Sequence, residues 1–325
     1  MKPEAKDLTL NNSFKLRSKA MNYYEFISNE ELNSFFKNSH HYEDLSIVGE
    51  GTNSIFPSVF HGTVLRSTNE SITETLNSDF TIKVGAGCNW DHLVDECVNN
   101  KLFGLENLAG IPGSVGAAPI QNIGAYGKEL SQFLTEVEVY DLKEKIFKNL
   151  SNEECKFGYR TSIFQSHKEF LITSVTIKLE KVFQPYMAYK ELENKKIDSS
   201  KEMVELIRKI RDDKLPDRES FPNVGSFFKN PILSQDEYDS NEKLHKLANV
   251  WREGGSIKLS AAELIELAGL KGIKINNVGV SLKHALVLTC TGIATQEDLV
   301  FMTNLIRERV KNDFDLDLKA EPNFL

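Results

Sequence analysis

The alternation of hydrophobic and polar positions along the chain predicts an α+β protein. Residues 45–53 (LSIVGEGTN) and 81–89 (TIKVGAGCN) each pass from an apolar, β-branched run into G-x-G-x-N, which predicts a strand followed by a glycine turn. After the second turn, apolar residues recur at helical spacing from Trp90 to Val98, and Asn89 is placed as an N-cap. Between residues 133 and 180 three stretches alternate as strands do, which predicts a largely antiparallel or mixed sheet.

Beyond residue 200 the pattern changes to helices and short strands. Residues 200–217 predict a helix that is stopped by Pro216, and a loop-rich stretch follows through Asn230. We therefore place a domain boundary near residue 215.

Two helix starts are predicted from capping chemistry. Ser260 and Glu263 predict a capping box, and Thr295 and Asp298 predict another before a long helix that ends near Asp313.

Three short segments near the C-terminus are predicted as strands. They are residues 273–280, residues 284–290 with Cys290 buried, and residues 315–325 with Glu321 at the end of the strand.

Composition and charge narrow the class of protein. A length of 325 residues predicts two or three domains, and 40% hydrophobic with 26% charged residues is typical of a globular protein. A net charge of −8 argues against binding along a nucleic acid backbone. No apolar run reaches the ~18 residues of a membrane span. The N-terminus lacks the apolar core of a secretory signal, so we expect a cytoplasmic location.

The four cysteines suggest neither a disulfide framework nor a metal site. Cys88, Cys97, Cys155 and Cys290 form no C-x-x-C pair and share no spacing with histidines, so we expect reduced, mostly structural thiols and no metal.

Small residues are concentrated at 111–130 (IPGSVGAAPIQNIGAYGKEL), which carries no charge before Lys128. Glycine lets backbone N–H groups line a concavity that suits a phosphate, although a plain tight turn uses the same residues. The Rossmann fingerprint fails because its third glycine is replaced by Ser54 or Trp90, and no P-loop is present.

Four further residues, in three segments, are candidates for chemistry. Tyr159 and Arg160 lie in FGYRTSIF, Ser226 lies in GSFFKNP, and Glu321 lies near the C-terminus. Taken singly, the residues favour a structural explanation: an exposed strand end for Tyr159 and Arg160, a loop turn for Ser226, and an ordinary solvated carboxylate for Glu321.

Taken together and in order, these segments resemble the bacterial UDP-N-acetylenolpyruvoylglucosamine reductases. The resemblance rests on motifs that span residues 49 to 322, namely GEGTN, VGAGCNW, GLENLAGIPGSVGAAPIQNIGAYG, FGYRTSIF, KLPD, GSFFKNP and AEP.

The resemblance implies an FAD-binding fold of the vanillyl-alcohol-oxidase type. Residues 1–67 and 68–215 would form two α+β FAD-binding subdomains, and residues 216–325 an α+β substrate-binding domain whose tail returns to the active site. It also implies noncovalent FAD, NADPH as co-substrate, and reduction of UDP-N-acetylenolpyruvoylglucosamine to UDP-N-acetylmuramate in peptidoglycan precursor synthesis. We expect a monomer that binds neither nucleic acid nor membrane.

The same resemblance assigns roles to residues. Hydride addition leaves an enolate-like charge, so the site needs a cation, a hydrogen-bonding group and a proton donor. Arg160 and Glu321 match the pair that contacts the enolpyruvyl carboxylate, and Ser226 matches the proton donor, with Lys214, Lys229 and Asn230 as tuning or gripping groups. Substrate binding is assigned to Tyr159, Tyr189, Lys214 and Asn230. Cofactor binding is assigned to Gly49, Glu50, Gly51, Thr52, Asn53, Gly85, Ala86, Gly87, Ile111, Pro112, Gly113, Ser114, Gly116, Ala117, Gln121, Asn122, Gly124, Ala125 and Tyr126.

Some features depart from the family pattern. Trp251 and His284 stand near positions where other residues are common, and the chain ends four residues after Glu321, so we expect little structure to support that carboxylate.

Two alternatives stay open from the residues. Another FAD-dependent oxidoreductase of the same fold could act on an alcohol or a sugar, with the flavin attached through Cys88 or His92. A catalytically silent nucleotide-sugar binding protein is the second.

Overall fold

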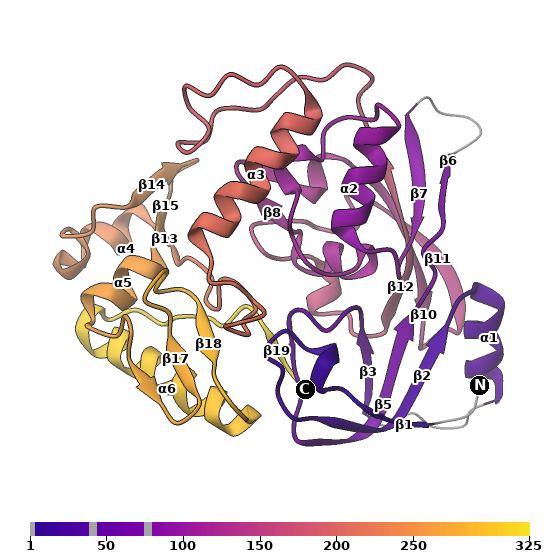
Figure 1. Ribbon diagram of the computed structural model, residues 1–325, viewed down its shortest axis with the longest axis horizontal. Coiled ribbons are helices and arrows are strands. Elements are labelled where there is room, and N and C mark those ends of the chain that lie inside the picture. Colours follow the sequence, from indigo (N-terminus) through magenta and orange to yellow (C-terminus); the bar gives the residue numbers. More distant parts are fainter. Residues whose placement is uncertain (1–3, 39–43, 75–79) are drawn as a thin grey trace. The chain divides into compact units, whose positions relative to one another are not determined.

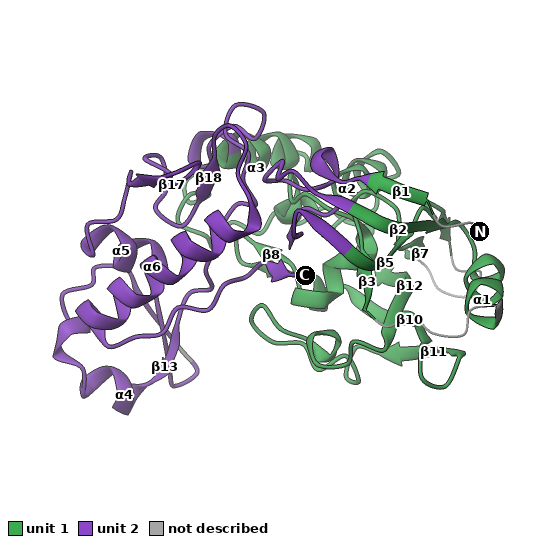
Figure 2. Cartoon of the chain, turned by 90° about the horizontal axis from the view of Figure 1, so that it is seen from below, with its two compact units in different colours: residues 1–6, 20–50, 61–211 green, residues 7–19, 51–60, 212–325 purple. Residues whose placement is uncertain are grey.

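A computed structural model describes residues 4–38, 44–74 and 80–325, which form two compact units (Figures 1 and 2). Unit 1 takes its residues from 1–6, 20–50 and 61–211, and unit 2 is built from 7–19, 51–60 and 212–325. Two short N-terminal segments therefore pack with the C-terminal part of the chain. The three-part division expected from the sequence stays a prediction.

The elements wholly or mainly in unit 1 are β1 (Glu4–Asp7), β2 (Lys19–Phe26), α1 (Asn29–Asn38), β3 (Leu45–Val48), β5 (Val59–Ser67), β6 (Ile72–Glu74), β7 (Thr81–Gly85), α2 (Trp90–Asn99), β8 (Gly124–Ala125), β9 (Lys128–Glu129), β10 (Leu134–Asp141), β11 (Ile146–Ser151), β12 (Phe170–Lys178) and α3 (Ser200–Lys214), with the 3₁₀ helices η2 (Glu106–Leu108), η3 (Val115–Gln121), η4 (Leu130–Gln132) and η5 (Ile163–Gln165).

The elements of unit 2 are η1 (Thr9–Asn11), β4 (Ser54–Ile55), β13 (Ile232–Ser234), α4 (Gln235–Asp239), η6 (Glu242–Leu244), β14 (Val250–Glu253), β15 (Ser256–Leu259), α5 (Ala261–Leu267), β16 (Lys274–Ile275), β17 (Val278–Val280), β18 (Leu288–Cys290), α6 (Gln296–Phe314) and β19 (Asn323–Phe324).

Unit 1 is organised around a five-stranded sheet in the order β11-β10-β12-β7-β6. Its neighbouring strands are antiparallel, which confirms the expectation for residues 133–180. A four-stranded sheet has the order β1-β2-β5-β3, and β3 and β5 in it run parallel.

Successive side chains of the five-stranded sheet enter two different cores, because strand residues alternate between faces. Val139 belongs to the core that α2 and α3 complete, whereas Tyr140 belongs to the core of α1. At the start of α2, the Asn89 side chain accepts a hydrogen bond from the His92 N–H at 2.9 Å, so the predicted N-cap is confirmed.

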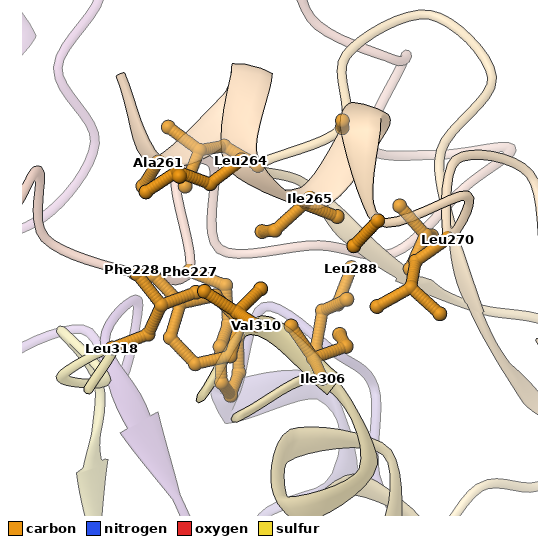
Figure 3. Packing of buried hydrophobic residues seen from close by; sticks show 14 of the residues in the cluster. Phe227, Phe228, Ala261, Leu264, Ile265, Leu270, Leu288, Ile306, Val310 and Leu318 are labelled. Carbon is orange, nitrogen blue, oxygen red and sulfur yellow. The ribbon is translucent and has the colours of Figure 1, made fainter. Parts of the chain in front are cut away.

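The core of unit 2 lies between α5, α6 and the two phenylalanines of GSFFKNP (Figure 3). Phe227 and Phe228 are fully buried and pack with Leu264 of α5 and Val310 of α6. The segment that contains Ser226 is thus fixed by the hydrophobic core of its own unit.

Two predicted features of unit 2 are corrected. Residues 273–280 form a hairpin of β16 and β17 rather than one strand, because Asn276 takes a left-handed conformation (φ 53°) in the two-residue turn. The Ser260 hydroxyl does cap α5, but the Glu263 carboxylate accepts from the N–H groups of Ala248 and Asn249 instead of completing a capping box.

The C-terminal segment is also corrected. Glu321 precedes the only strand of the 315–325 stretch, β19, which pairs in parallel with β4. Pro322 follows Glu321 directly and lacks an N–H for a longer ladder. No helix within 4–38, 44–74 or 80–325 is long and apolar enough to cross a membrane.

The second capping box is confirmed and yields a stability prediction. The Thr295 hydroxyl accepts from the Asp298 N–H, and the Asp298 carboxylate accepts from the Thr295 N–H at 3.1 Å. Thr295→Ala should lower the free energy of unfolding by about 1 kcal/mol, measured by urea titration. Thr295→Ser keeps the hydroxyl and is the control, so equal losses in both variants would contradict the capping role.

Candidate active site

Two of the glycine turns are joined backbone to backbone within unit 1. The N–H of Gly116 donates to the carbonyl of Ala86 at 2.9 Å, and the N–H of Val115 donates to Cys88 at 2.8 Å. A Cβ atom at position 116 would lie 2.5 Å from the Ala86 Cβ, so only glycine permits this approach.

The first glycine turn reaches the same place. A Cβ on Gly49 would collide with the Ser114 hydroxyl, and the Glu50 carboxylate accepts from the Asn89 side chain at 2.8 Å. The start of the first turn, at Gly49 and Glu50, and the two other turns therefore meet within unit 1, at residues 113–117.

One buried polar atom at this point lacks a hydrogen-bond partner among the described residues. The Ser114 side chain is 4% exposed, and its hydroxyl has no hydrogen-bond partner among the described residues. A buried hydroxyl without a partner is costly unless a ligand supplies one. Its position beside three glycine turns fits a phosphate oxygen of a dinucleotide such as FAD.

Asn122 is buried and takes a left-handed conformation (φ 46°). Its amide donates to Glu129 at 2.9 Å and to the Gly158 carbonyl at 3.2 Å, and its oxygen accepts from the Ser131 N–H. The side chain of this candidate cofactor residue thus positions the segment just before Arg160.

Arg160 itself sits in a strained backbone conformation, with φ at 51°. Its Nη2 donates to the Gly124 carbonyl at 2.6 Å, and the Gln165 amide donates to the Arg160 carbonyl at 3.0 Å. The Tyr159 ring lies 5.7 Å from the guanidinium carbon. Such strain concentrates at functional sites and requires contacts of this kind to hold it.

Two candidate tyrosines of unit 1 touch each other. The rings of Tyr126 and Tyr189 meet edge to face with their centroids 5.4 Å apart. Burial raises the pKa of Tyr126 to about 12, although Arg211 acts against this shift. Burial also raises the pKa of Tyr189, so both hydroxyls are neutral donors near pH 7.

In unit 2, Ser226 and Glu321 lie on neighbouring extended segments. Ser226 pairs with Val287 on one side, and on the other side the Glu321 N–H donates to the Phe227 carbonyl at 2.8 Å. The Ser226 side chain is exposed, whereas both following phenylalanines are buried. The segment therefore presents the hydroxyl away from the core.

The backbone of the short tail is held by residues that are remote in sequence. The Asn53 amide donates to the Glu321 carbonyl at 3.3 Å, and the Asn323 N–H donates to the Asn53 carbonyl at 3.0 Å. The Gln296 amide binds both the Ile55 carbonyl and the Leu325 carbonyl. Gly51, Thr52 and Asn53 thereby belong to the same unit as Glu321.

Lys214 and Asn230 lie elsewhere in unit 2. Lys214 is the last residue of α3. Burial, and to a smaller extent the positive charge of Lys214, lower the pKa of His284. The His284 Nδ1 accepts from the Leu286 N–H at 3.2 Å. The side-chain Oδ1 of Asn230 accepts from the N–H of Ala261 at 3.0 Å, at the first residue of α5.

The remaining candidate residues are placed as follows. Trp251 is exposed on β14; Gly85 ends β7, and Ala86 and Gly87 follow it; Ile111, Pro112 and Gly113 precede η3; Ala117 and Gln121 lie in η3; and Gly124 and Ala125 form β8.

Sequence reasoning missed Asn223. It is fully buried, its amide donates to the carbonyls of Pro216 and Phe221, and its oxygen accepts from the Gly225 N–H at 2.9 Å. It therefore fixes the turn directly before Ser226. Its place two residues before a glycine was the available signal, but asparagine is so common in turns that the signal is weak.

Covalent attachment of a flavin to Cys88 has little support. Burial, with smaller contributions from Glu70 and Glu50, raises the pKa of the Cys88 thiol to about 11. The thiolate is the nucleophilic form, so this cysteine is unreactive near pH 7. Over the described part of the chain, no group of three or more His, Cys, Asp or Glu residues could hold a metal ion.

Comparison with known proteins decides the family. Residues 216–325 match the model of the UDP-N-acetylenolpyruvoylglucosamine reductase C-terminal domain, and residues 27–148 match an FAD binding domain. A UDP-N-acetylenolpyruvoylglucosamine reductase of Aliivibrio fischeri is 41% identical over 85% of this chain and 81% of its own length. One of Shewanella oneidensis is 41% identical over 87% of this chain and 85% of its own. The chain belongs to the UDP-N-acetylenolpyruvoylglucosamine reductase family.

The fold agrees with this assignment. The crystal structure of UDP-N-acetylenolpyruvylglucosamine reductase from Thermus caldophilus superposes with a TM-score of 0.70 at 24% identity, covering 100% of this chain and 99% of that one. The expected fold class, an FAD-binding fold with a C-terminal α+β domain, is confirmed. The chain is an FAD-dependent oxidoreductase of peptidoglycan precursor synthesis, and an oxidoreductase acting on an alcohol or a sugar is not favoured.

A buried carboxyl beside the glycine turns yields a pH prediction. Glu106 is 5% exposed, one oxygen accepts from the Gly104 N–H, and the other has no partner among the residues described. Burial raises its pKa, so the folded state favours the protonated form. The resulting stability is present below the unfolded pKa of ~4.3 and is lost as pH rises through the folded pKa.

Glu106→Gln should therefore raise the thermal unfolding midpoint over wild type at pH 8 and by a smaller amount at pH 4. Calorimetry at both values tests this, with Glu205→Gln on the exposed face of α3 as the control. A gain that is larger at pH 4 would contradict it.

The tail yields a second prediction. Deletion of residues 323–325 removes β19 and the bond from Gln296 to the terminal residue, so the backbone just after Glu321 loses its contacts, while the bonds of Glu321 itself to Asn53 and Phe227 remain. We expect kcat to fall on the order of a hundredfold with an unchanged circular dichroism spectrum, because small misplacements of catalytic groups are costly. Leu325→Ala keeps the backbone contacts and should retain activity; an active truncated chain would show that the tail does not position Glu321.

Proposed function

We propose that Arg160, Ser226 and Glu321 carry the reduction of UDP-N-acetylenolpyruvoylglucosamine to UDP-N-acetylmuramate by NADPH. Bound FAD supplies the hydride acceptor for NADPH and the hydride donor for the enolpyruvyl carbon. The observation that carries the assignment is the pairing of the Ser226 segment with the Glu321 segment in unit 2, in a chain of this family.

FAD would be held noncovalently by the three glycine turns. The backbone bond between Gly116 and Ala86 brings two of these turns together, and the Ser114 hydroxyl beside them has no hydrogen-bond partner among the described residues. This supports the cofactor residues predicted within 85–87 and within 111–126, together with Gly49 and Glu50. Gly51, Thr52 and Asn53 are proposed for the same role.

Arg160 would bind the enolpyruvyl carboxylate and stabilise the charge that develops on it. Its guanidinium has the fork geometry for a carboxylate, and contacts on its side chain and its carbonyl hold it in place. Glu321 would polarise the same group, and Ser226 would give a proton to C2. A serine hydroxyl is a weak acid, so Lys214 and Lys229 are proposed to assist it.

Tyr189 would contact the nucleotide part of the substrate, and Tyr159 would shape the pocket beside Arg160. Lys214 and Asn230 are proposed as further substrate-binding residues. Tyr189 is partly exposed and neutral near pH 7, which suits stacking and a hydroxyl contact to a diphosphate. We also propose that the enzyme works as a monomer in the cytoplasm, without nucleic acid or membrane partners, and that residues 1–67, 68–215 and 216–325 act as its three functional parts.

The two half-reactions test the assignment of Ser226. In the wild type, NADPH without oxygen should bleach the flavin and UDP-N-acetylenolpyruvoylglucosamine should restore its colour. Ser226→Ala should bleach at the normal rate and recover about 10²- to 10⁴-fold more slowly in stopped flow, since a proton donor is lost.

Ser256→Ala, an exposed serine on β15 of the same unit, is the control. Equal slowing of both half-reactions by Ser226→Ala would reject the assignment, and a wild type that bleaches without recovering would reject the substrate.

A further inference from the structure

The position of Tyr189 depends on a long irregular connection. Residues 181–199, here called the tyrosine segment, join β12 to α3 and contain no helix or strand among the described residues (Figure 1). Connections of this length without regular structure are usually functional. Leu192 is fully buried in the core of unit 1, and Phe183 and Met187 pack against that core.

A single buried amide joins the tyrosine segment to the glycine-rich segment, defined as residues 111–126. Asn107 lies in η2 and is 3% exposed. Its Nδ2 donates to the Tyr126 carbonyl at 3.1 Å and to the Tyr186 carbonyl at 3.1 Å. Both hydrogens of one NH₂ group are thus used on carbonyls from two segments that are distant in sequence.

Ring contacts reinforce the same junction. The Tyr126 ring meets the Tyr189 ring, and the Lys128 Nζ lies 4.6 Å from the centroid of the Tyr186 ring. Gly127 leaves the space for that ring, because a Cβ there would collide with it. Tyr186 and Tyr189 are therefore both placed against residues that end or follow the glycine-rich segment.

We propose that Asn107 is a positioning residue that couples the glycine-rich segment to the tyrosine segment, so that FAD and the sugar nucleotide strengthen each other's binding. The inference rests on the proposed function, in which residues of the glycine-rich segment hold FAD and Tyr189 of the tyrosine segment contacts the nucleotide. Ordering of either segment fixes one carbonyl partner of Asn107 and so favours the arrangement that the other segment needs. By linkage, the factor by which FAD raises the affinity for the nucleotide equals the factor in the reverse direction.

The chemistry of the junction explains the residue type. Two carbonyl oxygens need two donors from a group that carries no charge into a buried place. Aspartate has the same shape but would turn a carboxylate oxygen toward carbonyl oxygens. Asn107→Asp is therefore the sharpest variant, and Asn107→Ala removes the donors without adding a charge.

Kinetics separate positioning from plain stability. In Asn107→Ala and Asn107→Asp, KM for UDP-N-acetylenolpyruvoylglucosamine should rise roughly tenfold or more, while anaerobic flavin reduction at saturating NADPH stays within about twofold. The matched control is Asn152→Ala. The Asn152 Nδ2 also donates to two carbonyls in unit 1, those of Ser131 and Leu134, both at 2.7 Å, but does not join these segments.

Binding to the FAD-free protein tests the coupling directly. The Kd for FAD is measured by flavin fluorescence with and without UDP-N-acetylmuramate as the probe. The wild type and Asn152→Ala should bind FAD several-fold more tightly when the probe is present, whereas the Asn107 variants should show nearly the same Kd in both conditions. Lys128→Met, which keeps the side-chain stem and removes only the charge over Tyr186, should weaken the coupling in the same direction and serves if the Asn107 variants fail to fold.

The inference would be overturned if UDP-N-acetylmuramate changed the Kd for FAD by the same factor in the Asn107 variants as in Asn152→Ala. It would also be overturned if the Kd of the wild type for FAD were the same with and without the probe. Failure of the proposed function gives a different result, because the reduced wild type would then not regain colour with UDP-N-acetylenolpyruvoylglucosamine.

Discussion

The close approach of two backbones at Ala86 and Gly116 is the constraint on which the candidate cofactor site depends. The bond between them brings the end of β7 to the start of η3, and it leaves no room for a side chain at position 116. A flavin that accepts and gives hydride needs close, fixed and uncharged neighbours, and backbone amides supply them without long side chains that lose entropy on ordering. The lack of charge in residues 111–127 follows from the same need.

In unit 2, the segment that contains Ser226 is fixed by the burial of two hydrophobic side chains. Phe227 and Phe228 are buried between α5 and α6, and this burial fixes the backbone one residue away from an exposed Ser226 (Figure 3). Extended pairing with residues 287 and 320–321 then sets the direction of the segment. The neighbours of Ser226 are thus ordered by the core of unit 2, whatever the Ser226 hydroxyl itself contacts.

Local chemistry made some features predictable from sequence and others not. The N-cap at Asn89 and the capping box at Thr295 were predictable because each partner lies within three residues. The tail was not, because its support comes from Asn53 and Gln296, which are remote in sequence. The partners of Glu263 were not predictable for the same reason. Its carboxylate accepts from the N–H groups of Ala248 and Asn249, just before β14, and not from the start of its own helix. For the site, residue types in ordered motifs identified the candidates, whereas their supporting contacts needed the structure.

Several of these supporting contacts are made by the same chemical group, the neutral side-chain amide. Asn107, Asn122 and Asn223 each bind backbone groups of more than one segment from a buried position. A charged side chain could also hold these segments, but burying a charge costs desolvation free energy. It would also add an electric field that shifts the pKa values of neighbouring groups. An amide provides donors and an acceptor at fixed geometry without that field. Because asparagine is also the ordinary residue of turns, such positions look bland in a sequence even where they determine the geometry of a site.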